Sequence, residues 1–159
     1  MIDLALEWNN DTSIADLVLS SGALQTHSGL RSAILISLFS DARADDTAIL
    51  PEEGGDRGGW WGDDFGGEVS SAAADRDDRN AIGSRLWLLR RSKVTQQVLR
   101  DARQHVLDAL GWLIRDGIAS AVSVEVEVQG DRLAIAVTLD RPTGPARERY
   151  DFTWEASVS

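Results

Sequence analysis

Residues 121–140 read AVSVEVEVQGDRLAIAVTLD, and this stretch decides the fold. Apolar residues alternate with polar or small ones on both sides of a turn at Gly130-Asp131. A period of two is typical of strands with one buried face, and short turns join such strands in antiparallel order. A third alternating run at 148–155 follows a longer turn at 141–145. We therefore predict a C-terminal three-stranded antiparallel meander that buries Val122, Val124, Val126, Val128, Leu133, Ile135, Val137, Leu139, Tyr150, Phe152 and Trp154.

Helical segments precede the meander. Thr95 is a suitable N-cap for a helix that ends near Asp116, and Gly117 stands where a C-cap glycine is expected. Gly111 inside this segment costs about 1 kcal/mol relative to alanine, so we expect close packing there. A shorter helix is predicted from about Ser84 to Arg91. The apolar stripe of the long helix consists of Leu99, Ala102, Val106, Ala109, Leu110, Leu113 and Ile114.

The N-terminal part combines strands with one helix. Alternation over residues 2–8 predicts a strand, and residues 15–27 predict a hairpin around Ser21-Gly22. A helix capped by Ser28 is predicted over residues 29–40, with apolar residues on more than one face, which indicates burial. Its β-branched content leaves a strand open for part of that segment. The predicted fold class is α+β, with N-terminal strands, two to three helices and the C-terminal meander.

Length, charge and residue content exclude several classes of function. The 159 residues suit one domain, 1–159, with a formal net charge of -10. That charge repels nucleic acid and anionic membranes. No apolar run approaches the roughly 20 residues of a membrane span, and residues 1–4 lack a signal-peptide pattern. The absence of cysteine and the separation of the two histidines, His27 and His105, predict no metal and no cofactor.

Residues 45–79 form a long acidic segment. The segment contains eleven acidic residues, three arginines and seven of the chain's fourteen glycines. We interpret it as a loop within the domain, because loops of such length usually bind something or are disordered when free. An acidic loop of this kind is expected to order on joining a partner.

Within this loop, residues 58–67 read GGWWGDDFGG. Trp60 and Trp61 are adjacent and cannot both point into one core from an extended segment, and tryptophan is enriched at binding hot spots. We predict that Trp60, Trp61 and Asp63 contact a partner. The alternative is a loop folded back over its own core. A phosphate-binding loop is disfavoured, since no Lys-Ser or Lys-Thr follows the glycines and the nearby acids repel phosphate.

Cations gather around Trp87. Arg85 and Arg90 flank the tryptophan, with Arg91 and Lys93 close behind. They can pair with the acidic loop of the same chain or of a neighbour, or form a solvated face, since exposed ion pairs contribute only about 0–1 kcal/mol. We take Arg85, Trp87 and Arg90 as a second candidate group of partner contacts.

The aromatic strand is the third candidate. Tyr150, Phe152 and Trp154 lie in the last predicted strand, residues 148–155. If that strand is an edge, its free N–H and C=O groups can pair with a strand of another chain. The alternative is an ordinary strand of the meander.

Catalysis is disfavoured. A glycosidase needs two positioned carboxyl groups across a sugar cleft, one with a raised pKa, whereas these acids crowd one loop, where solvent keeps the pKa near normal. Adjacent tryptophans can stack on sugars, so a carbohydrate-binding or lysozyme-like peptidoglycan-active protein remains the alternative function. A peptidoglycan binding and turnover assay separates the two, and a soluble host partner in a pull-down would indicate a third class, a regulatory module.

Several segments together carry a family resemblance. They are, in chain order, residues 3–6, 29–38, 59–63, 83–89, 116–118 and 141–142, with the closing aromatic strand. In these segments the chain resembles the small baseplate protein of Mu-like contractile phages, and through it the wedge or sheath-initiator proteins of contractile tails. The wider family has an acid-Pro-Arg motif near the end of the long helix. Here Arg115-Asp116-Gly117 occupies that region without the proline, so the contact that this motif makes in the family is not carried over.

The resemblance implies a non-enzymatic structural subunit present in six-fold copies around the tail tube. It implies contact with a larger baseplate wedge protein and with the tail sheath subunits, with strands shared between chains; tail tube or hub proteins are further candidate partners. It places the protein in the virion, in a tail baseplate assembled in the host cytoplasm. Some relatives in the wider family have been described as lysozyme-like, but no residue here supports a catalytic role.

Overall fold

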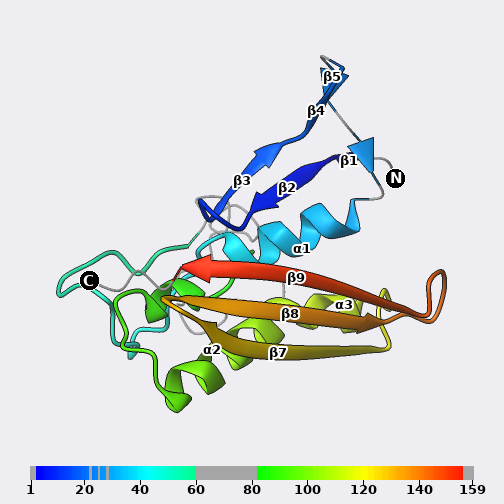
Figure 1. Ribbon diagram of the computed structural model, residues 1–159. Coiled ribbons are helices and arrows are strands. Elements are labelled where there is room, and N and C mark those ends of the chain that lie inside the picture. Colours follow the sequence, from blue (N-terminus) through cyan, green and yellow to red (C-terminus); the bar gives the residue numbers. More distant parts are fainter. Residues whose placement is uncertain (1–2, 22, 25, 28, 60–81, 156–159) are drawn as a thin grey trace, which may run out of the picture.

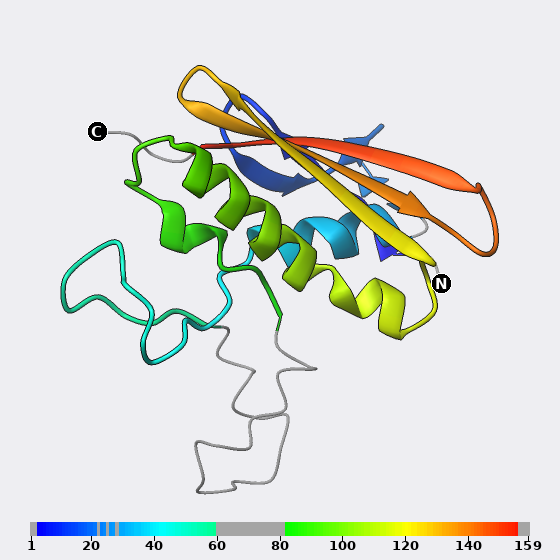
Figure 2. The ribbon, with the colours of Figure 1, turned by 90° about the horizontal axis from the view of Figure 1, so that it is seen from below.

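The computed structural model describes residues 3–21, 23–24, 26–27, 29–59 and 82–155. A three-stranded antiparallel sheet forms one layer, helices cover one of its faces, and two N-terminal strands continue beyond one edge (Figures 1 and 2). This is the α+β fold predicted from the sequence. No helix in the described ranges is long and apolar enough to cross a membrane.

The sheet is the predicted meander. Strands β7 (Ala121–Gln129), β8 (Arg132–Asp140) and β9 (Arg147–Glu155) pair in the order β7-β8-β9. Leu133 lies opposite Val128 and Trp154, and Leu139 lies opposite Val122 and Glu148. The alternate apolar residues of β8 are fully buried against the helices, because a strand presents every second side chain to the same face.

Helix α2 (Gln96–Ala109) crosses beneath the sheet and contacts β7. Thr95 caps it as predicted, its hydroxyl accepting a hydrogen bond from Val98 N at 3.3 Å. The predicted single long helix is wrong in one respect: it breaks after Ala109 and resumes as α3 (Gly111–Arg115). The space around Gly111 is open, so close packing does not explain this glycine. Gly117 ends α3 with φ 70°, as a C-cap glycine does.

Helix α1 (Leu30–Phe39) lies in the same layer as α2 and buries Ile34, Leu35 and Leu38. The predicted helix is therefore confirmed over the strand alternative. Residue 28, the expected cap, lies outside the described residues. The segment predicted as a helix over 84–91 is a short 3-10 helix, η3 (Leu86–Leu89).

Short strands build the N-terminal part. The hairpin strands β2 (Leu6–Asn9) and β3 (Ile14–Leu17) pair around a turn at residues 10–13, and β4 (Leu19–Ser20) pairs with β5 (Ala23–Leu24). Strands β1 (Asp3–Leu4) and β6 (Thr26–His27) form a third pair. The β2–β3 hairpin lies beyond the outer edge of β9 (Figure 1).

Candidate functional site

The outer edge of β9 is an open strand edge. Strand β9 pairs only with β8 in the sheet. In an antiparallel pair, alternate residues direct both N–H and C=O away from the neighbour. Thr153 is one of these, because its N–H donates to Asn10 Oδ1 at 2.9 Å and its C=O accepts from Trp8 Nε1 at 2.8 Å. The same alternation turns the backbone groups of Arg147, Arg149 and Asp151 outward.

The N-terminal hairpin closes only one end of this edge. Trp8 and Asn10 occupy the outward groups of Thr153, whereas no other backbone in the described ranges pairs with Arg147, Arg149 or Asp151 on that side. We call residues 147–151 the open window of β9. A strand of another chain can add here through main-chain hydrogen bonds.

Charged side chains border the open window. Arg147 Nε donates to Asp140 Oδ1 at 2.7 Å, and Arg149 Nε donates to Asp151 Oδ1 at 2.9 Å. The Arg147 hydrogen bond lowers the pKa of Asp140. Charges on an edge strand protect it from unselective pairing, so the window favours a partner strand with complementary charges.

The aromatic side chains of β9 point the other way. Phe152 is 2% exposed and Trp154 is 6% exposed, so both belong to the core of the free chain. Tyr150 is half-buried, and its hydroxyl donates to Glu148 Oε2 at 3.0 Å. Burial and this hydrogen bond raise the pKa of Tyr150 to about 12. These side chains hold β9 against the core and leave its outward backbone groups available; their contact with a partner stays a prediction.

Trp87 also faces inward. It is 8% exposed, and its indole N–H donates to Ala42 O at 2.7 Å. A Cβ added at Gly58 would stand 3.0 Å from the Trp87 ring, so this loop backbone packs tightly against the indole. Trp87 therefore joins the loop after α1 to η3 in the free chain, and its contact with a partner stays a prediction. The sequence shows that an aromatic residue is present, but not whether its side chain points into the core or toward solvent.

The arginines around Trp87 pair within the chain. Arg85 Nη2 lies 2.9 Å from Asp45 Oδ1, Arg90 Nη2 lies 3.5 Å from Asp41 Oδ1, and Arg91 Nη1 lies 3.1 Å from Glu52 Oε1. Arg85 and Arg91 thus pair with the acidic segment of the same chain, one of the pairings left open by the sequence, whereas Arg90 pairs with Asp41, which precedes that segment. These ion pairs are exposed and contribute about 0–1 kcal/mol each, so Arg85 and Arg90 can exchange partners.

The predicted loop anchors Trp60, Trp61 and Asp63 lie outside the described residues.

Strand β7 is the second sheet edge, and in the described ranges Arg103 of α2 covers its middle by donating to Val124 O at 2.9 Å. The sequence did not reveal that Trp8 and Asn10 cover the end of the β9 edge. The local pattern around them indicates only secondary structure, and their partner Thr153 is far away in the chain.

Other chemistry has little support among these residues. His105 is half-buried, and burial lowers its pKa. The described residues contain no group of three or more histidine, cysteine, aspartate or glutamate side chains placed to hold a metal. The described residues thus define a class of protein: an α+β chain whose three-stranded sheet keeps the outer edge of β9 partly open.

Comparison with known proteins gives the family. The family model described as Phage protein GP46 matches residues 30–146, and the chain belongs to this family. Baseplate protein gp46 of Escherichia phage Mu is 38% identical over 145 residues, which cover 91% of this chain and 90% of the Mu protein. Mu-like prophage FluMu protein gp46 of Haemophilus influenzae is 35% identical over 150 residues, 94% of each chain.

Proposed function

We propose that this chain is a structural, non-enzymatic subunit of a contractile phage tail baseplate, where it contacts a larger wedge protein and initiates sheath assembly by sharing a strand. The baseplate role and the place in the virion tail are supported by the name and high coverage of the Mu relative. The strand-sharing step rests on one observation, the open window of β9 beside a buried aromatic face.

The open window suits a sheath strand for a physical reason. The side chains of Phe152 and Trp154 fix β9 against the core, so its outward N–H and C=O groups are already arranged when the partner arrives. A preorganised edge lowers the ordering cost of association. Arg147 and Arg149 favour acidic or polar residues directly opposite them in the added strand.

Amide hydrogen exchange tests the shared strand. In the free protein the amides of Tyr150 and Phe152 bond to β8, whereas those of Arg149 and Asp151 face outward. Addition of purified sheath subunit of the same phage is expected to slow exchange at Arg149 and Asp151 by at least about tenfold. Unchanged exchange at both outward amides, with sheath subunit bound, would remove strand sharing from the proposal.

Contact with the wedge protein is assigned to the acidic segment and the arginines beside it. Arg85 and Arg90 keep exposed guanidinium groups with replaceable partners. Trp60, Trp61 and Asp63 supply the proposed hot-spot side chains for this partner.

The double variant Trp60→Ala/Trp61→Ala is expected to give a folded subunit that fails to enter the baseplate, because the anchoring side chains are lost and the core is not. Circular dichroism checks the fold, and immunoblotting of purified tails checks incorporation. The variant Ile114→Ala, at a side chain of α3 that is 50% exposed and lies outside the acidic segment, is the control. Tails that contain the double variant at normal levels would rule out the tryptophan anchor.

A further inference from the structure

The acidic segment begins in a loop, residues 44–57, that projects from the body of the protein beside η3 (Figure 2). The two ends of this loop meet, because Ala44 N donates to Arg57 O at 2.7 Å. Ala44 is buried, so the closed base of the loop is fixed to the rest of the chain. Compact surface loops with joined ends frequently carry a binding function. We call residues 44–57 the braced loop.

Polar contacts hold the shape of the braced loop. The Arg57 guanidinium donates to the carbonyl oxygens of Asp45 and Asp46, which ties the end of the loop to its start. Arg91 Nη1, which follows η3, lies 3.1 Å from Glu52 Oε1 and adds an exposed ion pair. Because all of these contacts use polar groups, the shape of the loop does not depend on burial of its apolar side chains.

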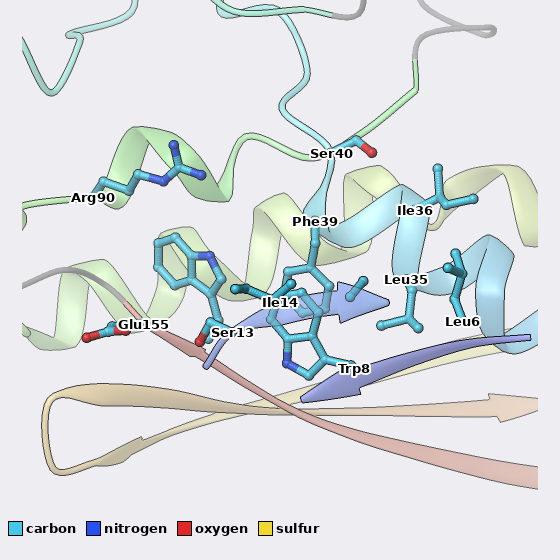
Figure 3. A pocket seen from close by; sticks show the side chains of 12 residues that line it. Leu6, Trp8, Ser13, Ile14, Leu35, Ile36, Phe39, Ser40, Arg90 and Glu155 are labelled. Carbon is cyan, nitrogen blue, oxygen red and sulfur yellow. The ribbon is translucent and has the colours of Figure 1, made fainter. Parts of the chain in front are cut away.

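Ile49 lies in the middle of the braced loop and is 91% exposed, more than any other large apolar side chain in the described part of the chain. Exposed isoleucines elsewhere have apolar neighbours, since Ile14 and Ile36 line a hollow of about 440 Å³ with Trp8 and Phe39 (Figure 3). A single exposed aliphatic side chain is common on protein surfaces. The closed loop distinguishes Ile49, because an anchor that is already held in place binds without the cost of ordering its backbone.

Unpaired carboxylates accompany this isoleucine. The braced loop contains five acidic residues and one arginine. Two of the five carboxylates pair with arginines of the same chain, whereas those of Asp46, Glu53 and Asp56 have no ion-pair partner among the described residues. Charges around an apolar contact select a partner of opposite charge. The surface that fits this loop is therefore an apolar pocket with lysine or arginine at its rim.

We propose that the braced loop inserts Ile49 into such a pocket on the neighbouring baseplate protein, where lysine or arginine side chains at the rim pair with Asp46, Glu53 and Asp56. This docking rests on the proposed contact between the acidic segment and the wedge protein, and it adds the anchoring side chain and the chemistry of the partner surface.

The variant Ile49→Ser tests the anchor. With native and variant chains produced in equal amounts during phage assembly, purified tails should contain at least about tenfold less variant than native chain by quantitative mass spectrometry, because burial of an isoleucine side chain strengthens binding by that factor. The midpoint of urea unfolding should not change, since Ile49 is exposed in the free chain. Ile114→Ser, at a half-exposed side chain of α3, is the matched control and should enter tails like the native chain. Equal amounts of Ile49→Ser and native chain in tails would overturn the proposal.

The triple variant Asp46→Asn/Glu53→Gln/Asp56→Asn tests the charged rim. It removes three negative charges and keeps the size of each side chain, so its share in purified tails should fall by about threefold or more in the same competition. Glu127→Gln, at an exposed carboxylate of β7, is the control and should compete normally. Normal incorporation of the triple variant would contradict a cationic rim and with it the proposed pocket.

Photocrosslinking identifies the partner surface. The photoreactive residue p-benzoylphenylalanine at position 49 of the full chain should crosslink, in assembled tails, to a segment of another baseplate protein that contains lysine or arginine. The same residue at position 114 should not give that crosslink. A crosslink from position 49 to a second copy of this chain, or no crosslink, would overturn the docking of Ile49. Failure of the proposed function gives a different result, because the native chain itself would then be missing from purified baseplates.

Discussion

Replacing Asp151 with proline is expected to prevent sheath assembly on the baseplate while leaving the subunit folded. The N–H of residue 151 points away from β8, so proline removes no hydrogen bond of the sheet, and edge strands tolerate proline at such positions. The ring denies the incoming strand a donor and blocks its close approach. Since each lost or blocked hydrogen bond contributes about 0.5–1.5 kcal/mol, we expect at least about tenfold fewer sheathed tails by electron microscopy.

Two control variants isolate the backbone effect. Asp151→Ala removes the side chain and its hydrogen bond from Arg149 but keeps the outward N–H, so tails should assemble normally. Phe152→Pro removes an inward N–H that bonds to β8 and should destabilise the fold itself, because proline cannot donate within a sheet ladder. If Asp151→Pro tails carried full sheaths while the variant stayed folded, the open window would not be the shared element.

The second large effect is a loss of folding stability on replacing Trp8. Trp8→Ala should lower the free energy of unfolding by about 3–5 kcal/mol, as large aromatic-to-alanine changes in cores do. Trp8 is buried, stacks on Phe39 and donates its indole N–H to Thr153 O, so it joins the hairpin to α1 and β9 together. Urea unfolding of the purified chain measures the loss.

A conservative variant separates packing from hydrogen bonding at this position. Trp8→Phe keeps an aromatic stack on Phe39 but leaves Thr153 O without its indole donor, so it should lose only about 1–3 kcal/mol. Ile49→Ala, far more exposed, should stay within about 0.5 kcal/mol of the native protein. A Trp8→Ala loss as small as that of Ile49→Ala would mean that the hairpin is not anchored through its tryptophan.

The amino-acid sequence by itself determined the meander, the capped helix and the helical segment before the acidic loop. Each of these signals is local: a side-chain period of two over residues 121–140, a threonine cap at Thr95, and an apolar run over 29–40. Residue patterns of this kind depend on neighbours within a few positions, so they can be interpreted without the fold.

Only the tertiary structure decided which groups remain free for a partner. Trp87 packs against Ala42 and Gly58 within the chain, a direction that its sequence neighbours do not reveal. The long helix predicted from the sequence breaks before Gly111, where the structure shows open space and not the close packing expected there. The limit of the β9 edge is set by a hydrogen bond between Trp8 and Thr153, 145 residues apart. Exposure depends on such distant contacts, and no local period records them, because strand alternation specifies the face of a side chain but not what covers it.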